Sequence, residues 1–140
     1  MAKRGRELLA RVPLFANLSP RYLRRLADFT EEQRYMEGGK VVREGDIGEA
    51  FYVIVEGEAK VVGRSGRAVN HLYPGDFFGE ISLLDGGPRT ATVVAATPLT
   101  MLALPRRALL DVIRQEPAVG AKLLQHVAGL LRRMEHSPSG

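Results

Sequence analysis

The chain contains no cysteine. Disulfide bonds, thiolate zinc sites and cysteine nucleophiles are therefore excluded. Long apolar runs are missing as well. The charged N-terminus, MAKRGRELLARVPLF, holds no apolar stretch of signal-peptide length. Nowhere does the sequence approach the roughly 20 apolar residues of a membrane span. We therefore expect a soluble, cytoplasmic protein without a membrane span.

The sequence also lacks the motifs of common catalytic and metal sites. It contains no G-x-S-x-G elbow, Walker loop, G-x-G-x-x-G or H-E-x-x-H. The histidines, His71, His126 and His136, are scattered, and no two have the spacing of metal ligands. Nothing marks a general acid and base. We expect no catalytic residues, no metal and no enzymatic activity.

Positive charge is only slightly in excess of negative charge. The net charge is +4, from 20 basic and 16 acidic residues, and the excess is spread along the chain. Basic residues cluster only at Arg21, Arg24 and Arg25 and at the pair Arg132 and Arg133, without interleaved aromatics. Nucleic-acid-binding surfaces usually show a clustered basic face or a known reading motif. We interpret these arginines as solvated helix faces and expect no direct binding of nucleic acid.

Helical patterns lie at both ends of the chain, which at 140 residues is large enough for one domain with its own core. Ser19-Pro20 is typical of a helix start, with a capping hydroxyl before proline at the first helical position. Pro105 fits the first position of a later helix. We predict a single domain with a helical N-terminal element over 6–28, a β-roll over 29–104, C-terminal helices over 105–134 and a tail over 135–140.

From residue 29 the pattern changes to short runs of about 4–7 residues separated by glycine turns, which indicates antiparallel strands. The run AFYVIV at 50–55 is apolar enough to be a central strand. About eight short strands at this spacing imply a sandwich or barrel. The predicted strands cover 29–36, 40–43, 50–55, 58–63, 68–72, 90–96 and 99–104.

One stretch, FFGEISLLDGGPRTAT at 77–92, gathers residues suited to a phosphorylated ligand. Gly79 allows a ligand to approach the backbone closely. Residues 81–84 could form one helical turn, whose first N–H groups are free to bind an anion. Arg89 offers a planar fork that fits a phosphate. An ionised Glu80 can only accept hydrogen bonds, so it suits ligand hydroxyls. Together these residues indicate a small phosphorylated sugar as the ligand.

This stretch resembles the phosphate-binding cassette of cyclic nucleotide-binding domains. The family pattern, F-G-E-[IL]-[SAC]-L followed by a short turn and R-[TSA]-A, appears here without a gap. The resemblance covers about residues 12–115, because glycines 45, 57, 75 and 79 also match the tight turns of the family. It implies an α+β fold, an eight-stranded antiparallel β jelly roll with N-terminal and C-terminal helices. The matching residues are Phe78, Gly79, Glu80, Ile81, Ser82 and Leu83, then Arg89, Thr90 and Ala91.

The resemblance also implies a role for each charged residue of the cassette. Arg89 would bind the cyclic phosphate, assisted by Thr90 and by the backbone N–H groups of Ile81 and Ser82. Glu80 would accept a hydrogen bond from the ribose 2′-OH. Without ligand we expect an open, hydrated cassette, since a buried charge without a partner is costly.

The implied ligand is cAMP or cGMP, and no cofactor is implied. Val61 and Val69 occupy positions that line the purine pocket in the family, although ordinary core residues would look the same. In the family, a hydroxyl at the position of Thr90 can favour cGMP, whereas alanine favours cAMP. Members that bind cAMP well also carry a hydroxyl there. Both nucleotides therefore stay open, with cAMP preferred.

The last predicted helix carries an apolar stripe, at Leu123, Val127, Leu130 and Met134, with the spacing of a coiled-coil seam. This stripe could cover the purine as a lid or pair with a second copy in a homodimer. Candidate lid contacts are Leu130, Leu131, Arg132 and Met134.

Members of this family usually act through an attached output domain. The six residues after Met134 are too few for a helix-turn-helix, so we expect a stand-alone sensor with an unidentified partner, or a fragment. Three functions are compatible with the sequence. The first is a cyclic-nucleotide-binding regulatory module. The second is the ligand-sensing half of a catabolite-activator-type transcription regulator without its DNA-binding domain, and the third is an interaction domain that binds no nucleotide.

Overall fold

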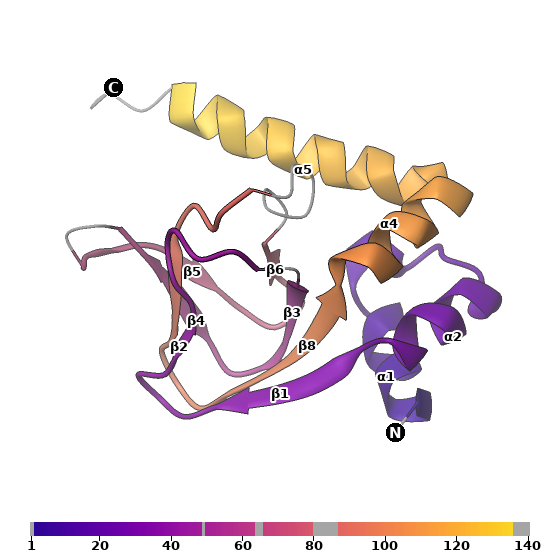
Figure 1. Ribbon diagram of the computed structural model, residues 1–140, viewed down its shortest axis with the longest axis horizontal. Helices are drawn as coiled ribbons and strands as arrows, with labels where there is room; N and C mark the ends of the chain where they lie inside the picture. The colour runs from indigo at the N-terminus through magenta and orange to yellow at the C-terminus, as the bar shows by residue number, and fades with distance from the viewer. Residues whose placement is uncertain (1, 49, 64–65, 80–86, 136–140) are drawn as a thin grey trace.

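The computed structural model describes residues 2–48, 50–63, 66–79 and 87–135 (Figure 1). Within these residues, two four-stranded antiparallel sheets have the strand orders β1-β8-β3-β6 and β2-β7-β4-β5. The predicted eight-stranded antiparallel jelly roll is thus confirmed. The strands are β1 (Glu31–Tyr35), β2 (Lys40–Val42), β3 (Ala50–Glu56), β4 (Ala59–Val62), β5 (Ala68–Leu72), β6 (Phe77–Phe78), β7 (Thr92–Ala95) and β8 (Leu99–Pro105).

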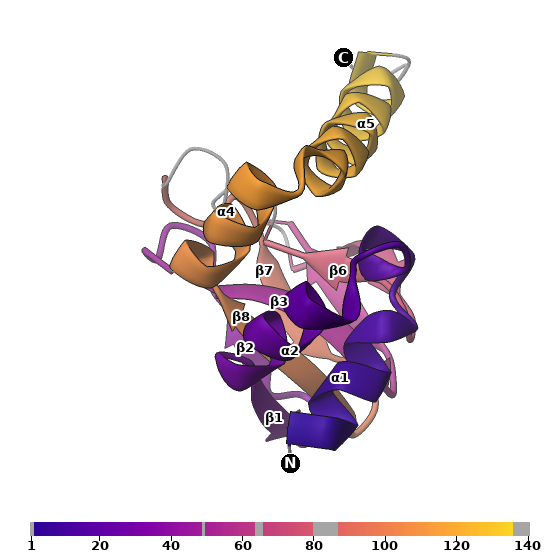
Figure 2. The ribbon, with the colours of Figure 1, turned by 90° about the vertical axis from the view of Figure 1, so that its right-hand side faces the viewer.

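Helices cover one side of the roll, and the last helix runs along its top in the view of Figure 1. Figure 2 shows this last helix rising from the body of the molecule beyond α4. None of the helices in the described part of the chain is long and apolar enough to cross a membrane. The helices are α1 (Ala2–Ala10), the 3-10 helix η1 (Pro13–Phe15), α2 (Pro20–Asp28), α4 (Arg106–Gln115) and α5 (Pro117–Glu135).

The sheet β1-β8-β3-β6 separates two hydrophobic cores. Because strand side chains alternate between faces, Phe51 and Val53 of β3 enter a first core shared with the helices. Tyr52 and Ile54 enter a second core between the two sheets. Burial on both faces explains the continuous apolar run AFYVIV, and β3 lies between β8 and β6 as predicted for a central strand.

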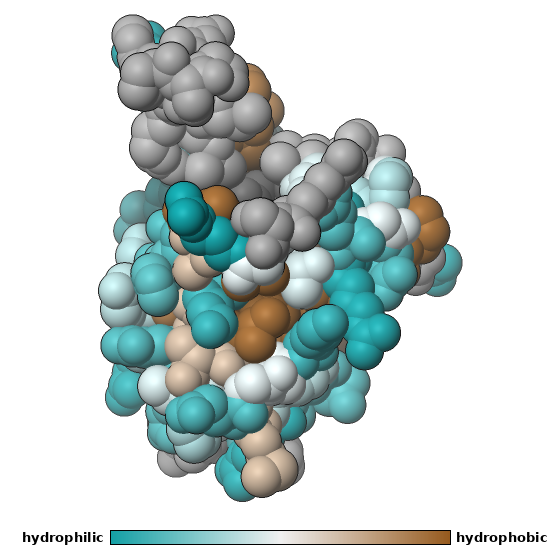
Figure 3. Space-filling model, turned by 90° about the vertical axis from the view of Figure 1, so that its left-hand side faces the viewer, coloured by the Kyte–Doolittle hydropathy of each residue, from teal (hydrophilic) through white to brown (hydrophobic). Residues whose placement is uncertain are grey.

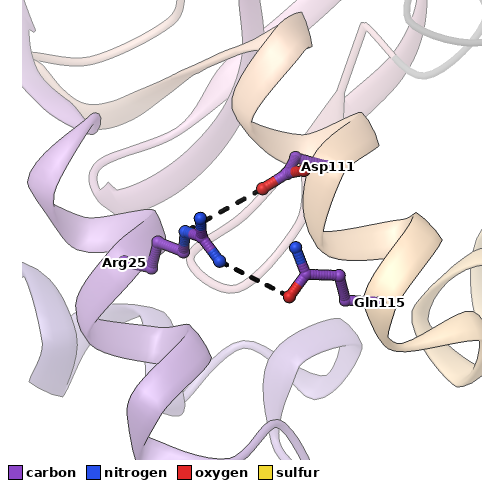
Figure 4. Close-up of polar contacts among 3 residues, drawn as sticks. All are labelled: Arg25, Asp111 and Gln115. Carbon is purple, nitrogen blue, oxygen red and sulfur yellow. Dashed lines mark hydrogen bonds and ion pairs between the residues drawn. The ribbon is translucent and has the colours of Figure 1, made fainter.

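Helices α2 and α4 are connected to each other by polar contacts as well as by the first core. Arg25 of α2 lies 3.9 Å from the Asp111 carboxylate and donates to the Gln115 side chain at 3.4 Å (Figure 4). The predicted outward face of α2 is confirmed, since Arg21, Arg24 and Arg25 are all exposed. Exposed ion pairs contribute little to stability. The alignment of α2 on α4 therefore depends mainly on the first core.

The predicted position of Pro105 is wrong. Pro105 is the last residue of β8 and pairs with Ala50 of β3. It occupies the N-cap of α4 with extended dihedral angles, φ −61° and ψ 139°, rather than the first helical position. Proline is tolerated there because the end of a strand requires no N–H donor from it.

Gly57, in the turn after β3, tests the packing of the roll. Its φ is +86°, and a Cβ would overlap the Pro98 carbonyl oxygen and lie 2.9 Å from the Thr97 hydroxyl. We expect Gly57→Ala to lower the free energy of unfolding by about 3 kcal/mol, from backbone strain and collision together. Thermal unfolding should detect this as a melting temperature lower by about 10 °C.

Gly38→Ala is the matched control. Its φ is +85°, but nothing lies within 4 Å of the added Cβ, so it should cost only about 1–2 kcal/mol of backbone strain. Equal losses in the two variants would show that the contact with Pro98 does not constrain the turn.

Candidate ligand-binding site

Among the residues that the structure describes, one charged side chain is buried. It is Arg89, with 5% of its surface exposed. It lies just before β7, and its backbone is fixed by the turn that leads into β3. The Arg89 N–H donates to the Asp46 carbonyl at 2.8 Å, and the Gly45 N–H donates to the Arg89 carbonyl at 2.8 Å. These two bonds direct the side chain into the roll.

The Arg89 guanidinium has one satisfied arm and one unsatisfied arm. Nη2 donates to the Ala50 carbonyl at 2.8 Å. Nη1 is buried and has no hydrogen-bond partner among the described residues. Burial lowers the pKa of Arg89 from its usual value, an effect that Tyr52 opposes, yet an arginine remains protonated in proteins. A buried cation with a free donor is costly, so the site is suited to an anion.

Two glycines make room for this guanidinium. A Cβ on Gly48 would overlap the guanidinium itself, lying 2.7 Å from its Cζ. A Cβ on Gly79 would lie 2.8 Å from Nη1 and 3.1 Å from the Ala50 carbonyl oxygen, and the φ of Gly79 is +94°. Gly79 therefore admits Arg89, a role that the sequence did not indicate.

Of the predicted cassette residues, the structure places Gly79 next to the Arg89 guanidinium, and Phe78 precedes Gly79 at the end of β6. Phe78 is buried, and its ring stacks on Tyr52 with centroids 5.0 Å apart. After Arg89 in the chain, Thr90 is exposed and Ala91 is half-buried. The other predicted cassette residues, Glu80, Ile81, Ser82 and Leu83, lie outside the described residues.

The two valines predicted to line a purine pocket have different surroundings. Val61 of β4 is half-buried and packs against the second core. Val69 of β5 is 66% exposed, next to a register shift in the pairing of β4 with β5. Figure 3 shows the face on the left of Figure 1, where hydrophobic residues gather near the middle among hydrophilic ones.

Sequence reasoning missed three contributors to the site: Gly48, Ala50 and Tyr52. The Arg89 Cζ lies 5.7 Å from the centroid of the Tyr52 ring. Burial raises the pKa of the Tyr52 hydroxyl, Tyr35 and Glu31 add to this increase and Arg89 opposes it, so Tyr52 is neutral at pH 7. The alternation within AFYVIV places Tyr52 and Ile54 on one face, but only the fold shows that Arg89 reaches that face.

Helix α5 contacts the roll beside the cassette. Its His126 ring lies 4.4 Å from the ring of Phe77, which in turn lies 5.1 Å from Phe51. Of the predicted lid residues, Leu131 is 55% exposed and Arg132 is exposed. The side chains of Leu130 and Met134 lie outside the described part of the structure.

The described residues contain no group of three or more histidine, aspartate or glutamate side chains that could hold a metal ion. A buried arginine with an open donor, set in a jelly roll, is thus the main chemical feature of the site. A model of the cyclic nucleotide-binding domain matches residues 32–116, which include this arginine and most of the roll. The chain belongs to the cyclic nucleotide-binding domain family.

The chain is similar to proteins of different kinds. A cAMP-dependent protein kinase regulatory subunit from Colletotrichum orbiculare is 35% identical over 131 residues, 93% of this chain and 31% of the relative. The catabolite activator protein structure from Thermus thermophilus superposes with a TM-score of 0.77 at 34% identity, covering 88% of this chain and 60% of that one.

A third similar structure is the regulatory subunit of a cAMP-independent protein kinase A from Trypanosoma brucei. It has a TM-score of 0.74 and 29% identity, and the match covers 98% of this chain and 48% of that chain. This chain therefore spans between about a third and 60% of the length of these three proteins.

Gly48→Ala tests the space around the Arg89 guanidinium. Because φ at Gly48 lies outside the left-handed region, the alanine adds no backbone strain, and its main effect is the collision with Arg89. We expect Arg89 to be displaced from the Ala50 carbonyl at a cost of about 1–3 kcal/mol. A shifted Arg89 Nε–H resonance in NMR spectra and a lower melting temperature should report this.

Gly63→Ala serves as the control, because its Cβ would meet only Val69 Cγ1 at an ordinary 3.7 Å. An Arg89 resonance that stays unchanged in Gly48→Ala would contradict the proposed confinement of the guanidinium.

Proposed function

We propose that this chain is a regulatory module that binds a cyclic nucleotide, with cAMP the preferred ligand over cGMP. The observation that carries the proposal is the buried Arg89 guanidinium, whose Nη1 has no partner within the described residues. A cyclic phosphate supplies the single negative charge and the acceptor oxygens that this group requires. The membership of the family and the cAMP-dependent kinase regulatory relative support the same ligand.

The remaining cassette residues complete the proposed site. The backbone N–H groups of Ile81 and Ser82 and the hydroxyl of Thr90 assist Arg89 at the phosphate. Glu80 accepts from the ribose 2′-OH, because a carboxylate can accept but not donate. Phe78, Ala91, Val61 and Val69 border the nucleotide. The proposed role is regulatory rather than catalytic.

What the module regulates is a separate proposal, because the kinase regulatory subunit and the catabolite activator protein are longer than this chain. Similarity to the catabolite activator protein favours, as second candidate, the ligand-sensing half of a transcription regulator. The Trypanosoma regulatory subunit, described as cAMP-independent, represents the third candidate, an interaction domain without nucleotide.

Direct calorimetry decides between these candidates. The protein is unfolded and refolded to remove bound nucleotide, then titrated with cAMP and with cGMP. We expect micromolar or tighter binding that Arg89→Ala weakens by at least about 30-fold, because truncating one partner of a buried charge pair costs about 2–5 kcal/mol. The ratio of the two affinities identifies the messenger.

Arg107→Ala is the matched control, since it removes an exposed arginine of α4 and should leave the affinity unchanged. A folded wild-type protein that binds neither nucleotide would overturn the proposal and favour a protein partner or another ligand.

Helix α5 is the proposed responsive element. It touches the roll through His126 and Phe77, one residue from Phe78 of the cassette. Its C-terminal part, from Gly129 on, would cover the purine as a lid through Leu130, Leu131, Arg132 and Met134. A ligand can shift this helix only by binding the closed arrangement more tightly than the open one.

The homodimer also belongs to this proposal, but through the exposed face of α5 rather than through the buried start of the predicted seam. Leu123, the first residue of the predicted seam, is fully buried in the first core of its own chain. Another stripe is exposed, with spacings of three, four and three residues that suit a coiled-coil contact. It consists of Ala121, Leu124, Ala128 and Leu131.

Removing residues 129–140 tests the lid. Because Leu123 is the last of the described α5 side chains that belong to the first core, the truncated protein should keep its fold and melting temperature. We expect its affinity for cAMP to fall about tenfold, the loss expected from one apolar side chain no longer buried against the purine. Calorimetry measures the affinity, and circular dichroism checks the fold.

Leu124→Glu in the full-length chain separates the lid from the dimer. It changes a residue that is 62% exposed on the second stripe, so sedimentation equilibrium should show reduced self-association without loss of nucleotide affinity. Unchanged affinity after truncation would exclude the lid. An equal loss in both variants would assign the effect to dimerisation.

A further inference from the structure

We propose that Tyr52 is a positioning residue that holds Arg89 ready for the phosphate, an inference that rests on the proposed function of Arg89. The Arg89 Cζ lies 5.7 Å from the centroid of the Tyr52 ring. This is within the roughly 6 Å at which a ring face attracts a cation. Tyr52 would thus act through Arg89 without touching the ligand.

The Tyr52 ring is itself fixed. It stacks on Phe78 with centroids 5.0 Å apart and an angle of 17° between the ring planes. Tyr52 and Phe78 are also directly paired where β3 meets β6. The aromatic support under Arg89 is therefore attached to the cassette residue that precedes Gly79.

Arg89 needs such support because its side chain, although buried, is long and is hydrogen-bonded to the described residues through Nη2. Its hydrogen bond to a described residue goes from Nη2 to the Ala50 carbonyl. Ala50 and Tyr52 lie two residues apart on β3, and both pack in the second core, so one strand supplies both contacts. One hydrogen bond restrains one arm, and the proposed attraction to the Tyr52 ring is a second restraint that leaves Nη1 available.

The arrangement also explains why an arginine suits the site better than a lysine. A planar guanidinium can stack on an aromatic face while its donors stay free for a phosphate, whereas an ammonium group is a compact, strongly hydrated charge. The ring of Tyr52, rather than its hydroxyl, is the part that this role requires.

The test compares Tyr52→Leu with Tyr52→Phe, which keeps the ring. Phe15→Leu is the control for lost stability, because Phe15 is fully buried in the first core and belongs to no part of the site. In the ligand-free protein, the ¹⁵N heteronuclear NOE of the Arg89 Nε–H reports the order of the side chain. Its signal is assigned by its absence in Arg89→Lys.

We expect Arg89 to be ordered in the wild type, in Tyr52→Phe and in Phe15→Leu, and mobile in Tyr52→Leu. By calorimetry, Tyr52→Leu should lower the affinity for cAMP about tenfold, within the range of a desolvated cation–π contact, and Tyr52→Phe should change it less than about twofold. In the Arg89→Lys background, Tyr52→Leu should have little further effect, as expected if Tyr52 acts through the guanidinium.

An Arg89 side chain that stays ordered in Tyr52→Leu would overturn the inference. So would equal losses of affinity in Tyr52→Leu and Phe15→Leu, because a general loss of stability would then explain both. The order of Arg89 is measured without ligand, so it decides the role of Tyr52 even if the wild type binds no nucleotide. In that case the proposed function fails by itself.

Discussion

The site depends on one constraint, the placement of a guanidinium in the interior of a β-roll. Arg89 is 5% exposed, and a cation of this kind is tolerated only when its donors are satisfied or a counter-charge arrives. The Ala50 carbonyl satisfies one arm, and the described residues leave Nη1 open. The glycines at 48 and 79 follow from the same constraint, since a side chain at either position would occupy the space of the guanidinium.

Strand β3 connects this site to the rest of the molecule. One face of β3 packs Phe51 and Val53 against the helical layer, and the other places Tyr52 beneath Arg89. The two residues of strand β6 also point to opposite faces of the sheet. Phe78 stacks on Tyr52 inside the roll, and Phe77 contacts His126 of α5 outside it. The surroundings of Arg89 are therefore connected to α5 through the rings of Tyr52, Phe78 and Phe77.

Most of the fold could be predicted from local patterns. Short apolar runs between glycine turns predict seven of the described strands but not β6, which lies within the cassette stretch. The turn glycines at 45, 57, 75 and 79 all have positive φ, as tight turns require. The errors occurred where tertiary contacts override local preference. Pro105 ends a strand because it pairs with Ala50. Leu123 belongs to the core of its own chain because α5 begins against the helical layer.

The sequence by itself determined the strand and helix periods and the family, because these depend on residue types and on spacings of a few residues. Arg89 next to Thr90, after Phe78-Gly79-Glu80, was sufficient to identify the family. Only the tertiary structure decided what surrounds Arg89. Gly48, Ala50 and Tyr52 lie about 40 residues earlier in the chain, and only the closure of the roll brings them to the guanidinium. Their role could not be predicted because burial and contact are properties of the closed roll rather than of local sequence.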